Sequence, residues 1–442
     1  MTQTSTIQGW LAERNVENVE LIVSDMAGIA RGKVQPTALL KSKDIKLPIA
    51  IFAQTIDSQF YMSRENVVDS DMFLQPDAST LRLVPWSSGT TASVLMDCRD
   101  IKGKTVEESP RMVLRRIVEK YEARGWVPIV APEVEFYLAK LQPEHDGESA
   151  DADSELQFDG HIDGYGIEGF HDLGEFFEQL SAHCRIQEIS LEGVSQELGP
   201  GQFEVNFHYG SPVKLADDVF HFKRTLKRVA QEHGLRVTFL AKPVAGGSGS
   251  SMHIHQSVYN DRGENIFVNS DGSNSKLFEN YLGGLQKYMT DALLMFAPYA
   301  NSYRRFLNFF SSPVNLEWGV DNRTVGLRIP ISDAESRRIE NRLAGSDVNP
   351  YLVIAGSLAC GYLGMTEKLV PRPAVKASAY ELPFALHRHL YEALDAFRDS
   401  VALRNILGEE FVTVYSKVKE MEYRMFQSRL TDWERNELAN IV

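Results

Sequence analysis

The sequence predicts an α+β fold in two parts, a small α/β unit over residues 1–105 and a large α+β domain over residues 106–442. Three observations lead to this prediction. Short β-rich runs separated by Gly, Pro, Asp and Ser clusters fill the first part. The polar segment 102–110 then has the composition of a linker. Beyond the linker, strands and helices mix without the regular alternation of a doubly wound sheet.

The first part begins with a helix-compatible stretch and continues with runs of β-branched residues. Its expected elements are one helix and three strands, at 7–14, 19–23, 81–84 and 92–96. The linker ends in Ser109 and Pro110, a pair that often opens a helix. We therefore expect a helix at 111–124.

The second part is expected to contain strands at 127–130, 134–138, 203–207, 237–241 and 253–258. The longer helices are expected at 216–233, 276–296 and 350–369. Segment 144–155 is acidic and poor in apolar residues, which predicts an exposed loop. No GxGxxG follows a strand, and the Gly-Lys-Thr at 103–105 lacks the first glycine of a Walker A loop. A nucleotide would have to bind in another way.

The composition disfavours several classes of protein. The formal net charge is −14 without a dense Lys/Arg block, which argues against nucleic-acid binding. No apolar run approaches the roughly 20 residues that cross a bilayer, and the N-terminus lacks the pattern of a secretory signal. The three cysteines, Cys98, Cys184 and Cys360, suit neither a disulfide framework nor a CxxC metal site. We expect buried thiols in a cytoplasmic protein.

Two of the expected strands carry polar side chains at every second position. Glu133 and Glu135 lie in an otherwise apolar strand, and His253, His255 and Ser257 alternate in another. Taken alone, such patterns are more often solvated faces, salt-bridge partners or structural histidines. Two carboxylates in an apolar strand are nevertheless costly without compensating charge, so other charged groups are expected to converge there.

Two further motifs supply such groups. Glu197 and Glu204 flank a Gly-Pro-Gly turn, as in a hairpin. Arg338, Glu340 and Arg342 alternate in charge, a pattern that is usually a surface ladder. Together the motifs would gather five carboxylates and one imidazole, from Glu133, Glu135, Glu197, Glu204, Glu340 and His253. Such an oxygen-rich shell suits Mg²⁺ or Mn²⁺, and two such ions clamp a transferring phosphoryl group.

Landmarks in order along nearly the whole chain resemble the glutamine synthetase superfamily, in character the γ-glutamylpolyamine and γ-glutamylamine synthetases. They are 71–80, 133–136, 199–204, 242–243, 251–257, 301–305, 321–330, 337–340 and 348–351. The resemblance implies the glutamine synthetase fold, in which a small β-grasp-like domain precedes a catalytic domain with an antiparallel sheet cradle flanked by helices. It also implies a ligase that uses ATP and two or more Mg²⁺ or Mn²⁺ ions to activate the γ-carboxylate of glutamate.

Matched residue by residue, the resemblance implies a role for each position. The first metal is implied at Glu135, Glu197 and Glu204, and the second at Glu133, His253 and Glu340. ATP is implied at His255, Ser257, Arg328 and Arg338. Glutamate is implied at Gly249, Arg305, Arg323 and Arg342, of which Arg323 and Arg342 are also catalytic, on the transferring phosphoryl group. The loop 246–251 departs from the family's usual residues, which weakens the assignment of Gly249.

The pattern departs from the family where ammonia would bind. Ammonia-using members carry a glutamate at the position of Ser311, and serine can neither hold ammonium nor take its proton. A second ammonium-site run is reduced to 57–59, in which Asp57 is expected to keep a catalytic role beside Ser311. The freed volume could be lined by Phe309, Phe310 and Trp318. The sequence therefore favours an organic amine, either an alkyl monoamine or a polyamine, in amine catabolism or detoxification.

Two other interpretations stay open, an ammonia-using glutamine synthetase with a relocated base and a non-catalytic structural or regulatory relative. The intact metal-ligand positions disfavour the second. The resemblance implies a homo-dodecamer of two hexameric rings, with active sites between subunits and Asp57 reaching the next protomer. The other expected partners are glutamate, an amine and ATP, with neither nucleic acid nor membrane.

Overall fold

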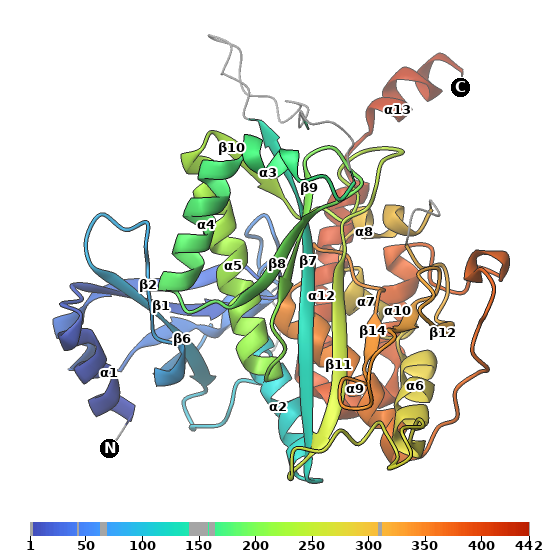
Figure 1. Cartoon of the computed structure of the whole chain (residues 1–442). Helices are drawn as coiled ribbons and strands as arrows, with labels where there is room; N and C mark the ends of the chain where they lie inside the picture. The colour runs from blue at the N-terminus through green and yellow to red at the C-terminus, as the bar shows by residue number, and fades with distance from the viewer. Residues whose placement is uncertain are drawn as a thin grey trace.

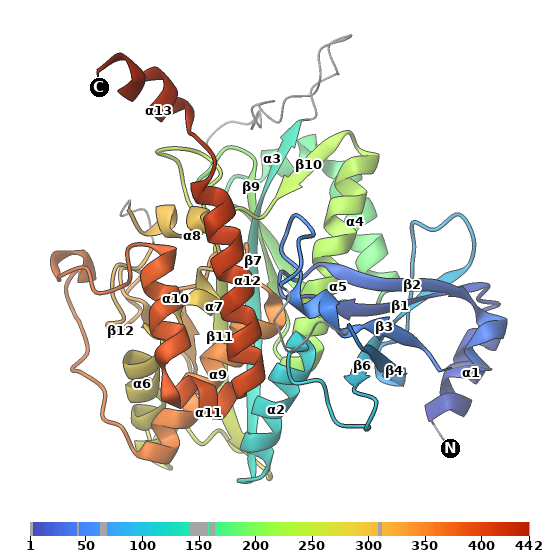
Figure 2. The same ribbon diagram turned by 180° about the vertical axis from the view of Figure 1, so that it is seen from behind.

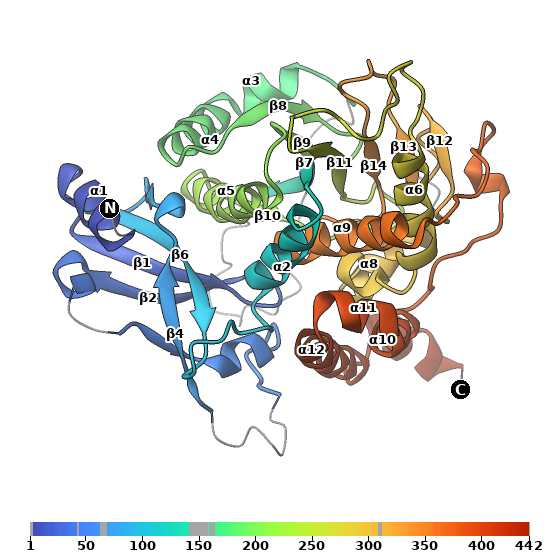
Figure 3. The same ribbon diagram turned by 90° about the horizontal axis from the view of Figure 1, so that it is seen from below.

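The protein contains two β-sheets, one from each part of the chain (Figure 1). The computed structural model describes residues 3–41, 44–61, 69–140, 158, 164–307 and 312–441. Seen from below, the N-terminal sheet lies to one side of a larger body of strands and helices (Figure 3). This arrangement confirms the predicted α+β fold class.

The first part is a mixed sheet with one helix. Its elements are α1 (Gln3–Glu13), β1 (Asn18–Ser24), β2 (Ala30–Pro36), η1 (Thr37–Lys41), β3 (Lys46–Pro48), η2 (Ile49–Ala53), β4 (Asp71–Pro76), η3 (Ala78–Thr80), β5 (Arg82–Leu83) and β6 (Thr91–Arg99). The strand order is β2-β1-β6-β4-β3, with β5 also paired to β6. Strands β1 and β6 run parallel, and the other pairs are antiparallel.

The second part begins at helix α2. Its first elements are α2 (Pro110–Glu122), β7 (Trp126–Lys140), α3 (Glu168–Asp172), α4 (Gly174–Ile186), β8 (Leu191–Gln196), β9 (Gln202–Phe207), α5 (Pro212–Glu232), β10 (Leu235–Thr238) and β11 (Met252–Asn260). They continue with α6 (Lys276–Tyr288), α7 (Leu293–Phe296), α8 (Ala300–Arg304), η4 (Arg305–Leu307), β12 (Trp318–Val320), β13 (Leu327–Ile329) and β14 (Ile339–Asn341). The last are α9 (Pro350–Glu367), η5 (Ala379–Glu381), α10 (Leu390–Asp399), α11 (Val401–Leu407), α12 (Glu409–Gln427), α13 (Asp432–Asn436) and η6 (Leu438–Asn440).

The larger sheet forms the cradle that the resemblance implies. Its order is β12-β13-β14-β11-β7-β9-β8, with β10 also paired to β7. Only β12 and β13 pair in parallel among the described strands of this sheet. Helices α2 and α5 pack on β7, and α9 packs against α2, α5 and α6. From behind, α10, α11 and α12 cover the body (Figure 2).

Four expected elements differ from the observed ones, the strands at 127–130, 134–138 and 237–241 and the helix at 276–296. The strands at 127–130 and 134–138 form one strand, β7, because the pairing with β11 continues through Ala131 and Pro132. The helix at 276–296 is interrupted between α6 and α7, where Thr290 and Asp291 disfavour a helix and Asp291 accepts a bond from the Ser400 hydroxyl. Strand β10 ends at Thr238, whose hydroxyl accepts the Leu240 N–H. Segment 144–155 lies outside the described residues.

A buried ion-pair network joins the two parts. Arg111 of α2 is 4% exposed. It donates to Asp77 and Asp97 of the first part at 2.8 and 2.6 Å, and to both oxygens of Asp217 of α5 at 2.9 and 2.8 Å. Tyr351 of α9 donates to Asp217 as well. We propose that residues 1–105 and 106–442 are two domains held together by this network.

Two remaining sequence predictions concern cysteines and membrane spans. Cys98, Cys184 and Cys360 are free and buried, as predicted. None of the helices in the described ranges has the length and apolarity required to traverse a bilayer.

Candidate active site

The metal-ligand candidates lie on adjacent antiparallel strands. The register places Glu133 of β7 opposite His253 of β11 and Glu135 of β7 opposite Glu204 of β9. The hairpin expected around the Gly-Pro-Gly turn is present, because Glu197 N donates to Gln202 O at 2.9 Å. Side chains at alternate positions of a strand share a face, so the sequence spacing brings these groups together.

One half of the cluster is rich in bonds between opposite charges. Glu133 Oε2 lies 3.2 Å from His253 Nδ1, and Glu133 Oε1 lies 2.8 Å from His255 Nε2. Glu340 of β14 accepts from Arg328 at 2.6 Å and from Arg342 at 2.5 Å. Burial would raise the pKa of both glutamates, but these partners outweigh it. The bonds from His253 and His255 hold the pKa of Glu133 well below its usual range, and Arg342 and His253 lower the pKa of Glu340 to about 2.

The other half is rich in carboxylates. Burial, followed by repulsion from Glu197, raises the pKa of Glu135 to about 8. Burial, followed by repulsion from Glu133 and Glu135, raises the pKa of Glu204 to about 9. The pKa of Glu197 is also raised, chiefly by burial. These three side chains therefore lack enough nearby positive charge to be ionised together.

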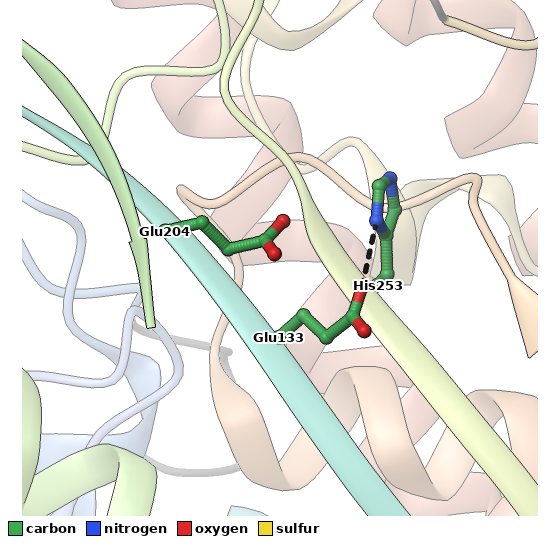
Figure 4. Close-up of side chains that lie close together, drawn as sticks. All are labelled: Glu133, Glu204 and His253. Atoms are coloured by element: carbon green, nitrogen blue, oxygen red, sulfur yellow. Dashed lines mark hydrogen bonds and ion pairs between the residues drawn. The ribbon is translucent and has the colours of Figure 1, made fainter. Parts of the chain in front are cut away.

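The donor set fits a divalent cation. Ligand atoms of Glu133, Glu204 and His253 lie within 4.8 Å of one another, as do those of Glu133, His255 and Glu340. Figure 4 shows the Glu204 carboxylate directed toward the Glu133 and His253 pair. His253 is buried, and its Nε2 has no hydrogen-bond partner among the described residues. An oxygen-rich shell with raised carboxylate pKa values is suited to Mg²⁺ or Mn²⁺ and unsuited to structural zinc.

A large cavity opens beside the cluster. It measures about 1320 Å³, and its walls include four predicted residues, Glu133, His255, Ser257 and Arg338. Arg338 Nε donates to His255 Nδ1 at 3.2 Å, which leaves His255 Nε2–H to donate to Glu133. The cavity is large enough for a nucleoside triphosphate whose phosphates reach the carboxylates.

The sequence prediction missed several walls of this cavity. Asn206, Tyr209, Tyr259 and Asn265 contribute to it, and Tyr209 is 77% exposed although it is a large aromatic residue. An exposed aromatic side chain two residues beyond the end of a strand is the signal that could have identified Tyr209. Asn265 and Tyr259 line the cavity because the fold brings both side chains to Glu335, where they donate hydrogen bonds to its backbone carbonyl.

Gly249 and Arg305, two of the residues predicted for glutamate binding, lie near Glu135 of the carboxylate-rich half. Arg305 is 1% exposed and donates to the carbonyls of Leu343 and Arg342 and to the Ser251 hydroxyl. A Cβ at Gly249 would lie 2.9 Å from Arg305 Cγ, so only glycine fits beside this arginine. Burial, offset in part by Glu135, lowers the pKa of Arg305 to about 10.

Three further predicted residues are placed by the structure, and a fourth lies outside the described residues. Arg328, expected on the phosphate side of ATP, bonds Glu340 and Asp321 and so faces the metal cluster. Arg323 is exposed between β12 and β13, where it lowers the pKa of Glu197. Asp57 is exposed and bonded to Thr55 and Gln59 of its own turn. Ser311, together with Phe309 and Phe310, lies outside the described residues.

Comparison with known proteins adds four findings. The model of the family described as glutamine synthetase, catalytic domain, matches residues 107–438. A glutamate–isopropylamine ligase of Pseudomonas sp is 34% identical, over 100% of this chain and 98% of that protein. The γ-glutamylputrescine synthetase PuuA of Escherichia coli (strain K12) is 31% identical, over 95% of this chain and 91% of its own length. The solved structure of a GmaS/ADP complex superposes with a TM-score of 0.84 and 26% identity, over 98% of this chain and 99% of that one.

Proposed function

Since this chain belongs to the glutamine synthetase family, we propose that it is an ATP-dependent ligase that joins the γ-carboxylate of glutamate to an organic amine. The observation that supports the proposal most is the juxtaposition of a cavity large enough for a nucleoside triphosphate with a cluster in which the carboxylates of Glu133, Glu204 and Glu340 lie close to His253 and His255. The two similar ligases named above act on amines according to their names.

The chemistry requires activation of an unreactive carboxylate. An oxygen of the glutamate γ-carboxylate attacks the γ-phosphorus of ATP, which forms γ-glutamyl phosphate and releases ADP. The amine nitrogen then attacks the acyl carbon, phosphate leaves and an amide bond forms. Divalent cations at Glu135, Glu197 and Glu204, and at Glu133, His253 and Glu340, would supply charge neutralisation at the phosphates.

The residues of the chain position the reactants. Glutamate is proposed to bind at Gly249 and Arg305, with Arg323 and Arg342 on its carboxylates and on the transferring phosphoryl group. Arginines in that position are worth about 10³-fold or more in related phosphoryl transfers. ATP is proposed to bind along His255, Ser257 and Arg338, while Arg328 supports the cluster through Glu340.

The amine must lose a proton before it attacks. Alkylammonium groups have a pKa near that of lysine, about 10.4, so few are free bases at neutral pH. Asp57 and Ser311 are the proposed amine-site residues, with Asp57 supplied by a neighbouring subunit of a homo-dodecamer. The dodecamer, the choice of Mg²⁺ or Mn²⁺ and a cytoplasmic location belong to this proposal and rest on the family and on the free thiols.

A panel of amines tests the proposal. Phosphate release would be followed with ATP and glutamate, together with isopropylamine, methylamine, ethylamine, putrescine, spermidine or ammonium at neutral pH. We expect at least one organic amine to exceed ammonium in kcat/KM by about 10²-fold or more, the scale on which sites discriminate a missing apolar group. Robust turnover with ammonium and no preference for alkylamines would replace the proposal with glutamine synthesis.

A further inference from the structure

Gln202 occupies a central position that no motif assigned. It follows the Gly-Pro-Gly turn and is 2% exposed. Its Nε2 donates to Glu135 Oε2 at 2.9 Å and to the Gly249 carbonyl at 2.8 Å. Its Oε1 accepts from Gly199 N at 2.9 Å and from the Tyr137 hydroxyl at 3.0 Å. The reversed amide would set oxygen against two acceptors, so these partners fix its orientation.

The same side chain secures the loop at 246–251. The single proton of the Tyr137 hydroxyl is shared between Gln202 Oε1 at 3.0 Å and the Ser248 carbonyl at 2.9 Å, and Ser248 is next to Gly249, whose carbonyl Gln202 binds. Ser251 N donates to Glu135 Oε2 at 2.8 Å. Two donors therefore hold one oxygen of Glu135, and neither of them occupies Oε1. The loop and the carboxylate are linked through one buried amide.

The turn itself is shaped to admit this amide. A Cβ at Gly199 would lie 2.2 Å from the Tyr137 hydroxyl and 2.7 Å from Gln202 Oε1. Any larger residue there would displace both groups. The turn thus both orients Glu197 and Glu204 and leaves space for the Gln202 contacts.

We propose that Gln202, supported by Tyr137, is a positioning residue that couples cation binding at Glu135 to glutamate binding at the 246–251 loop. The inference rests on the proposed function for the identity of these two ligands. A cation that fixes Glu135 also fixes the Gln202 amide, which in turn holds the Gly249 carbonyl in place. Coupling between two sites is reciprocal, so each ligand tightens the other by the same factor.

Calorimetry on the full-length protein tests the coupling directly, without turnover. The Kd of glutamate is measured with saturating Mn²⁺ and with a chelator, and the Kd of Mn²⁺ with and without glutamate. We expect glutamate to bind about tenfold or more tightly with Mn²⁺ in the wild type, a typical size for such coupling. We call the ratio of the glutamate Kd without Mn²⁺ to the glutamate Kd with Mn²⁺ the coupling factor. Gln202→Met keeps the side-chain volume but removes the hydrogen bonds, and should bring the coupling factor to within about twofold of unity.

The controls separate coupling from general damage. Gln286→Met removes another buried amide, which donates to Leu316 O and accepts from Arg372 N in another region, and should keep the wild-type factor. Tyr137→Phe removes one hydroxyl and should give an intermediate factor, which preserves the test if Gln202→Met does not fold. A wild-type factor near unity, or an unchanged factor in Gln202→Met or Tyr137→Phe, would overturn the inference. Failure of the proposed function is distinguishable, because the amine panel would then show either no phosphate release or release with ammonium and no preference for alkylamines.

Discussion

The two halves of the metal cluster balance their charge in different ways. Glu133 and Glu340 are surrounded by His253, His255, Arg328 and Arg342 and have lowered pKa values. The half built from Glu135, Glu197 and Glu204 has raised pKa values because burial and mutual repulsion dominate. The first of these halves is ionised by the protein itself, whereas the second needs an added cation. The difference predicts distinct responses to mutation, pH and metal removal.

The half that contains Glu133 and Glu340 is called the balanced half below, because the histidines and arginines around it compensate its charge. The largest effect is expected from Glu340→Ala, which removes one of its two carboxylates. The buried guanidinium group of Arg342 and the partly buried one of Arg328 would lose the Glu340 carboxylate beside His253, and Arg328 would keep another carboxylate partner, Asp321. We expect phosphate release to fall by about 10³-fold or more. A thermal melt should confirm that the variant folds, and the surface variant Glu367→Ala serves as the matched control. Turnover within about tenfold of the wild type would contradict the assignment.

The second effect concerns the carboxylate-rich half and pH. Because Glu204 and Glu135 have pKa values of about 9 and 8 without a cation, a cation must displace protons from them. Cation affinity should therefore weaken by about tenfold or more per pH unit as the pH falls from about 8 to about 6. Calorimetry in buffers of different ionisation enthalpy would count the released protons. A cation affinity that does not change with pH over this range would contradict the proposed difference in charge balance between the two halves.

A third prediction concerns stability in the absence of metal. The folded protein holds protons on Glu135 and Glu204 up to a higher pH than the unfolded chain, so its stability decreases as the pH rises from about 5 to about 9. Glu204→Gln removes one of these groups and should raise the metal-free Tm at about pH 8 by about 1 °C, the shift that corresponds to roughly 1 kcal/mol in a chain of this length. The same variant should lose most of the stabilisation that added Mn²⁺ gives the wild type. Differential scanning calorimetry at two pH values, with a chelator or with Mn²⁺, measures the metal-free Tm and the stabilisation by Mn²⁺. A lower metal-free Tm in the variant than in the wild type would contradict the proposed difference between the two halves.

The smallest effect is expected from Asp321→Asn. Asp321 accepts from Arg328 at 2.7 Å and its side chain is 50% exposed, so its charge is largely screened by solvent. Asparagine also tolerates the positive φ of 49° at this residue. We expect kcat/KM to fall by less than about fivefold. A larger loss would show that the balanced half depends on Asp321 to orient Arg328.

The sequence predicted the ligand cluster because alternate residues of a strand point to the same face of the sheet, so the spacing of the polar residues shows which of them share that face. Glu133, Glu135, His253 and Glu340 follow from that rule once their strands pair. The sequence did not predict the contacts of residues that are placed by segments far away in the chain. Arg328 bonds Glu340 because β13 pairs with β14, and Gln202 meets Gly249 across 47 residues. The interruption between α6 and α7 depends on Ser400, which is remote in the sequence.

The Arg111 network has a consequence for recombination between relatives. A fragment that begins near residue 106 would keep Asp217 but lose Asp77 and Asp97, two of the carboxylates around this buried guanidinium. Breaking a buried ion pair by removing one partner costs about 3–5 kcal/mol, a large share of the stability of an ordinary protein. Neither part is therefore a self-sufficient module, and a chimaera that exchanges the N-terminal part must carry matching aspartates with it.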